Sequence, residues 1–135
     1  MLLSFLFSIV VAGLPQPKDT GTCALLKAIL KDSVSSRVFK LNRHPELSIR
    51  FLDMQGQLNS NCTFDPVFGK KVEVVFKPAH YFRSRPLDIM IQKVERDKER
   101  YKVHYFQPST GAVGYILLKR KETGFKVVKV IHTQY

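Results

Sequence analysis

Residues 101–130 read YKVHYFQPSTGAVGYILLKRKETGFKVVKV, and the spacing of their apolar side chains decides the fold class. Tyr101, Val103 and Tyr105 alternate with polar residues, and the same alternation resumes after each of two turns rich in Gly, Pro, Ser and Thr. A period of two is typical of a β-strand that buries one face. The short turns favour antiparallel hairpins, so this stretch predicts consecutive strands of one sheet.

The same alternation occurs upstream, over residues 72–76 and from Leu87 onward, which brings the expected total to about five strands. Before them, apolar residues between Cys23 and Phe39 fall at helical spacing on one stripe. Thr22 is a suitable N-cap for that helix. Residues 46–54 fit a short helix and a strand equally well, and residues 55–66 read as a loop or a weak edge strand.

An amphipathic helix must bury its apolar stripe, and the sheet is the only large partner that the sequence offers. We therefore predict one α+β domain over residues 22–135. In it, the N-terminal amphipathic helix packs on a curved antiparallel sheet of about five strands.

The first residues, 1–13, read MLLSFLFSIVVAG and carry no charged side chain. An apolar run of about ten residues followed by small residues is typical of a signal peptide, and it is too short to span a bilayer. Residues 14–21 contain two prolines and a glycine and are expected to be a mobile lead. The sequence thus predicts a secreted, extracellular protein without a membrane span.

Cys23 and Cys62 are the only cysteines. In a secreted protein an even pair predicts one disulfide, which would close a loop of about 40 residues and contribute roughly 3–4 kcal/mol to stability. No Cys or His stands at metal-ligand spacing from either one, so no metal site is expected. Asn61 begins an Asn-Cys-Thr triplet and is therefore a candidate glycosylation site.

The stretch from Leu87 to His132 resembles the strand meander of the nuclear transport factor 2-like superfamily. The likeness is greatest over residues 114–130, GYILLKRKETGFKVVKV, where a basic strand turns at Gly and returns as aromatic-Lys-Val-Val. The resemblance implies a cone-shaped α+β fold, which could hold a small apolar ligand. That superfamily usually has two or three helices before its main sheet, whereas this sequence predicts one.

The cystatin-like fold, with one helix and a four-stranded sheet, is the nearest alternative. Cystatins carry a Gln-x-Val-x-Gly hairpin, and residues 107–111 read QPSTG, which lacks the central Val. Inhibition of proteases by that route is therefore not expected.

Some members of the resembled superfamily are isomerases or dehydratases with an acid or base inside the cone. The candidates here are Asp88, Tyr101, His104, Tyr105 and His132. Because Asp88 and His104 alternate with the apolar positions of their strands, both are expected to face solvent. The sequence has none of the common nucleophile, phosphate-loop or zinc motifs. No catalytic residue and no cofactor are predicted.

The net charge of +11 makes association with a polyanion plausible. Lys119, Arg120 and Lys121 precede the turn at Thr123–Gly124, and Lys126 and Lys129 follow it. On paired strands Lys119 and Lys121 share one face and could lie near Lys126 or Lys129 across the hairpin. Such a patch could bind a sulfated or phosphorylated polymer. Aromatic residues are not interleaved with them as single-stranded nucleic acid would require, so a nucleic-acid partner is not expected.

Three functions remain open from the sequence. The first is a secreted, non-catalytic binding domain for a small apolar ligand in the cone or for a partner on the sheet. The second is an enzyme of the isomerase or dehydratase type that uses the same cone. The third is a surface that binds an extracellular polyanion such as a glycosaminoglycan.

Overall fold

The computed structural model describes residues 18–58, 61–79 and 82–134. The predicted signal peptide, residues 1–13, lies outside this part of the chain, as do residues 14–17 of the predicted lead. Within the described residues, two helices precede the strands, α2 (Lys18–Lys31) and α3 (Ser33–Phe39). The strands that follow are β1 (Ile49–Asp53), β2 (Val72–Phe76), β3 (Asp88–Asp97), β4 (Arg100–Gln107), β5 (Ala112–Lys121) and β6 (Gly124–Gln134).

The α+β class is confirmed, but the sheet differs from the predicted one. It has six strands in the order β2-β1-β3-β4-β5-β6, and it is mixed. Strands β3 to β6 form the expected antiparallel meander, whereas β1 pairs in parallel with both β2 and β3. The long connections that follow β1 and β2 allow these crossovers, which two-residue turns would not. The segment 46–54, which fitted two structures equally well, contributes strand β1.

The single predicted helix is in fact two helices that break at Asp32. This residue is extended (φ −76°, ψ 126°), and its carboxylate accepts a hydrogen bond of 2.9 Å from the backbone N–H of Ser35. A short acidic side chain at this position caps the next helix, and here it does so without interrupting the apolar spacing. Because α2 already begins at Lys18, Thr22 lies inside it and is not its N-cap.

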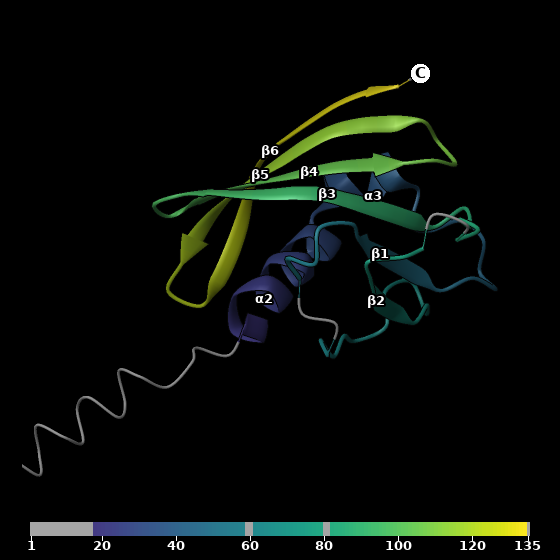
Figure 1. The fold of residues 1–135 in the computed structure, drawn as a ribbon, viewed down its shortest axis with the longest axis horizontal. Helices are drawn as coiled ribbons and strands as arrows, with labels where there is room; N and C mark the ends of the chain where they lie inside the picture. Colours follow the sequence, from purple (N-terminus) through teal and green to yellow (C-terminus); the bar gives the residue numbers. More distant parts are fainter. Residues whose placement is uncertain (1–17, 59–60, 80–81, 135) are drawn as a thin grey trace, which may run out of the picture.

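The core lies between α2 and the concave face of the sheet, and Figure 1 shows β3 to β5 curving over that helix. Leu26 and Ile29 of α2 are buried in one cluster with Val103, Tyr105 and Ile116 of the sheet. The concave face is therefore filled by core side chains.

Gly114 is required where β5 passes beneath the ring of Tyr105. The Tyr105 hydroxyl donates a hydrogen bond of 3.2 Å to the carbonyl oxygen of Ile131, so the ring reaches from β4 to β6 across β5. A Cβ atom on Gly114 would overlap that same carbonyl oxygen and would lie 2.9 Å from the Cα of His132. The β6 backbone can approach β5 this closely only because Gly114 has no side chain.

Candidate functional site

The structure brings most of the predicted hairpin cations to one face. Lys119 and Lys126 are direct cross-strand partners, and Lys121 lies on the same face, two residues beyond Lys119. Lys129 pairs with Leu117, which lies on the same face of β5 as Lys119, so Lys129 also lies on this face. All four lysines are exposed on the side of the sheet away from the helices.

Arg120 does not belong to that face. It pairs with Phe125, and its guanidinium carbon lies 5.8 Å from the Phe125 ring on the opposite side of the hairpin. The hollow of about 690 Å³ at the hairpin end is lined by Glu99 and Glu122 as well as by Lys119, Arg120 and Lys121. The hairpin surface is thus basic on one face and of mixed charge at its tip.

A second basic region lies where the end of α2, α3 and residues 66–68 meet. It is a groove of about 800 Å³, called the basic groove below. Its charged lining consists of Lys31, Arg37, Lys40 and Arg43, and none of the described residues that line it is Asp or Glu. Sequence reasoning missed this region, because its cations are scattered over three elements.

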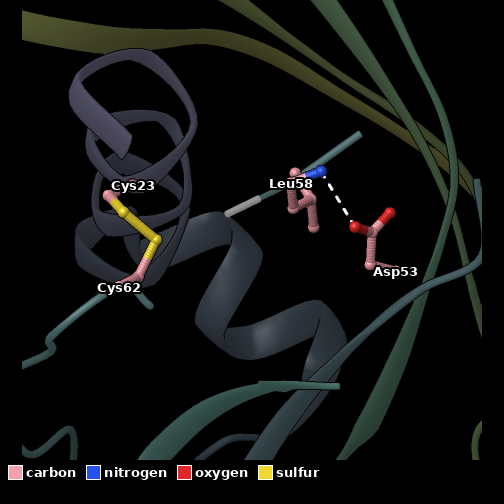
Figure 2. Close-up of a disulfide and its surroundings, with 4 residues drawn as sticks. All are labelled: Cys23, Asp53, Leu58 and Cys62. Carbon is pink, nitrogen blue, oxygen red and sulfur yellow. Dashed lines mark hydrogen bonds between the residues drawn. A yellow bond between two sulfur atoms is a disulfide. The ribbon is translucent and has the colours of Figure 1, made fainter. Parts of the chain in front are cut away.

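The loop wall of the basic groove is held against α2 by the predicted disulfide, which is confirmed. Cys23 and Cys62 are bonded, with their Cα atoms 5.5 Å apart, and Figure 2 shows the bond joining the helix to the loop. Lys27 and Lys31 follow Cys23 at spacings of four and eight residues, so this face of α2 looks toward the loop. Asn61 is exposed next to the bond, and its glycosylation stays a prediction.

The loop is also fixed where it leaves β1. The buried carboxylate of Asp53 accepts hydrogen bonds of 2.9 Å from the backbone N–H groups of Gln57 and Leu58. Figure 2 shows the bond to Leu58 in the same view as the disulfide. Residues 63–67 lie next to α2, since they line one hollow together with Lys27, Leu30 and Lys31.

A tight turn at Phe68 and Gly69 forms the outer rim of the basic groove. Val67 and Lys70 exchange backbone hydrogen bonds of 3.0 and 2.9 Å, and both central residues have positive φ, 51° for Phe68 and 71° for Gly69. This mirror-image turn normally carries Asn-Gly or Asp-Gly. Here it carries an aromatic side chain that is 58% exposed.

Asp88 was predicted to face solvent, and this is wrong, since its side chain is fully buried. Arg50, its partner on β1, donates two hydrogen bonds to the two carboxylate oxygens, of 2.7 Å from Nε and 2.6 Å from an Nη atom. The backbone N–H of Arg85 donates a third, of 2.7 Å. The Arg50 side chain and the chain before β3 contact Asp88 on this face of the sheet, which alternation along one strand could not reveal.

The ion pair of Arg50 and Asp88 links the parallel strands β1 and β3. The hydrogen bond to Asp88 raises the pKa of Arg50 above its ordinary value, although burial acts in the opposite direction. The Arg50 guanidinium also lies 4.6 Å from the ring centroid of Phe82. Because Asp88 already accepts from three protein donors, its carboxylate is engaged in holding the strands together.

The other acid and base candidates do not converge on one point. His104 lies on the outer face, as expected, 2.9 Å from Glu95, and this contact together with Lys93 lowers the pKa of Glu95 to about 2. His132 is exposed near the end of β6. Tyr105 points into the core, where burial raises its pKa to about 12.

Tyr101 also lies on the inner side, with its ring 4.9 Å from that of Phe125 in an edge-to-face arrangement. Within the described ranges, no group of three or more His, Cys, Asp or Glu side chains is placed to hold a metal ion. In the same part of the chain, no helix has both the length and the apolar character needed to cross a bilayer.

The basic groove therefore combines a hollow, exposed cationic side chains and a lining without a described carboxylate. No family model matches this chain, and no curated protein or solved structure matches it either. The resemblance to the nuclear transport factor 2-like superfamily accordingly stays a prediction, and the case for function rests on the residues themselves.

Proposed function

We propose that the protein is a secreted, non-catalytic binding domain that holds an extracellular polyanion in the basic groove. The observation that carries the proposal is the charge of the groove, where four cationic side chains line a hollow of about 800 Å³ without a described carboxylate among them. The net charge of +11 would attract the same partner from a distance.

The geometry favours an extended anion over an isolated small ion. Lys31 comes from the end of α2, Arg37 from α3, and Arg43 from the chain after α3, so the charges are distributed along the groove. A polymer that neutralises all four cations would release its own counterions, and binding should weaken by on the order of 100-fold between about 50 and 200 mM salt. A single phosphate ion would contact fewer of them.

The test compares two variants with the same change in net charge. The first, Lys31→Gln/Arg37→Gln/Arg43→Gln, removes three exposed cations from the groove. The second, Lys119→Gln/Lys121→Gln/Lys126→Gln, removes three exposed cations from the hairpin face. Binding to heparin is measured by calorimetry over a series of salt concentrations, with circular dichroism as the check that both variants are folded.

We expect the groove variant to lose most of its affinity and most of its salt dependence, while the hairpin variant keeps both. Equal, small losses in the two variants would mean that binding follows net charge and has no defined site. Heparin binding that is absent from the natural protein at low salt would refute the proposal altogether.

The hairpin face is the second candidate for the same function, favoured by one observation. Lys119 has a cation as its direct partner on both sides, Arg100 on β4 and Lys126 on β6. Like charges directly opposite each other destabilise a sheet, and a bound anion would relieve the repulsion. Selective loss of heparin binding in the hairpin variant would place the site there.

A further inference from the structure

Phe68 combines two features that the fold does not require. A bulky side chain at φ 51° is unfavourable, since the left-handed region suits Gly, Asn or Asp. The ring it carries remains 58% exposed and so contributes little to the core. Strained residues persist where the surrounding structure imposes them, and they concentrate at binding sites.

The ring is held in a defined position at the rim of the basic groove. The turn is closed by two backbone hydrogen bonds between Val67 and Lys70. Lys70 is only 3% exposed, and its ammonium nitrogen lies 5.8 Å from the centroid of the Phe68 ring. A bound ligand would therefore meet a preformed aromatic surface together with the cations of the groove.

The pairing of an aromatic ring with cations restricts the chemistry of the ligand. A polyphosphate chain would satisfy the cations but has no apolar face for the ring. A membrane surface would prefer several apolar side chains on a convex surface, whereas the cations here line a hollow. A sulfated sugar carries anionic groups on a rigid ring, and the C–H face of that ring stacks on aromatic side chains.

We propose that the basic groove selects a sulfated glycan, with one sugar ring stacked on Phe68 and the sulfate groups bound by Lys31, Arg37 and Arg43. This inference rests on the proposed function, since it names the class of polyanion that the same groove would bind. Phe68 supplies the preference for sugar rings, and the cations supply the attraction for negative charge.

The chain contains no tryptophan, so Phe68→Trp gives a fluorescence signal from this one position. Phe76→Trp is the matched control, because Phe76 is 56% exposed, lies beside Lys77 in a similar way and does not line the groove. Each variant is titrated with a heparin hexasaccharide and with inorganic polyphosphate of equal total charge. We expect a change in the F68W emission with the hexasaccharide, little change with polyphosphate, and none from F76W with either.

Phe68→Ala supplies the second measurement. By analogy with aromatic side chains that stack nucleic-acid bases, removal of the Phe68 ring should weaken hexasaccharide binding roughly tenfold, while the affinity for polyphosphate stays the same. An equal loss for both anions, or no loss for either, would overturn the role of Phe68 while leaving the groove as an anion site.

Two further outcomes distinguish failure of the sulfated-glycan inference from failure of the proposed polyanion-binding function. Failure of the natural protein to bind either anion would overturn the proposed function as well. A blue shift of F68W emission on vesicles containing phosphatidylserine, with no response to the hexasaccharide, would overturn the glycan in favour of a membrane surface.

Discussion

Replacing Asp88 by Asn should destabilise the protein strongly, because it removes the negative partner of a nearly buried arginine. Asp88 is fully buried, the side chain of Arg50 is only 13% exposed, and two short hydrogen bonds join them. Removing one partner of a buried ion pair usually costs about 3–5 kcal/mol. Arg50 also contacts the Phe82 ring and keeps some exposure to water, which favours the lower end, about 3 kcal/mol.

The measurement is urea unfolding followed by circular dichroism. A loss of about 3 kcal/mol should lower the midpoint by about 1.5–2 M urea, given the usual dependence for a domain of this size. Asp97→Asn is the matched control, because Asp97 lies exposed on the same strand and should change the midpoint little.

A second comparison separates the ion pair from simple loss of packing. Asp88→Leu leaves the Arg50 charge without a partner, whereas Arg50→Met/Asp88→Leu removes both charges and should recover part of the lost stability. The reasoning is refuted if Asp88→Asn unfolds within about 0.5 kcal/mol of the natural protein, the range typical of surface substitutions. The same conclusion follows if the double variant is no more stable than Asp88→Leu alone.

Four further predictions concern other parts of the fold. Gly114→Ala should lower the unfolding midpoint sharply, because its methyl group would overlap the Ile131 carbonyl; an unchanged midpoint would show that β6 moves away freely. Replacing Cys23 and Cys62 by Ser opens a loop with a sequence separation of 39 and should cost roughly 3–4 kcal/mol in chemical unfolding. The same variant should bind heparin more weakly even where it is fully folded, since the loop wall is released. Tyr105 should ionise near pH 12 in an ultraviolet titration, above the ordinary pKa of a tyrosine, because its side chain is buried. Its raised pKa means that the unfolded chain loses this proton first, so stability should fall as the pH rises from 10 to 12.

The meander of β3 to β6 could be predicted from the sequence because its information is local. Each strand buries one face, which imposes the alternation of side chains, and short turns place consecutive strands next to each other. The alternation of side chains and the short turn also predicted that Lys119 and Lys121 share one face with Lys126 nearby, which the register confirms. Arg120 was included as their neighbour in the chain, although the same alternation already placed Lys119 and Lys121 together on one face.

The disulfide was also predictable, because a chain with two cysteines and a predicted export signal offers one pairing. The break between α2 and α3 was not, since the apolar spacing continues across Asp32 and only the backbone angle there reveals the cap. The parallel pairing of β1 could not be predicted for another reason. It joins residues far apart in the chain, so neither the alternation of side chains nor the residues of the turns indicate it.

The sequence by itself determined the α+β class, the order of the last strands, the cysteine pair and the strongly basic character of the protein. Only the tertiary structure decided that Asp88 is buried against Arg50 and that cations from α2, α3 and the following loop line one groove. Alternation and charge count are properties of neighbouring residues along the chain. Burial and grooves are made by segments that meet only when crossovers and a disulfide bring them together.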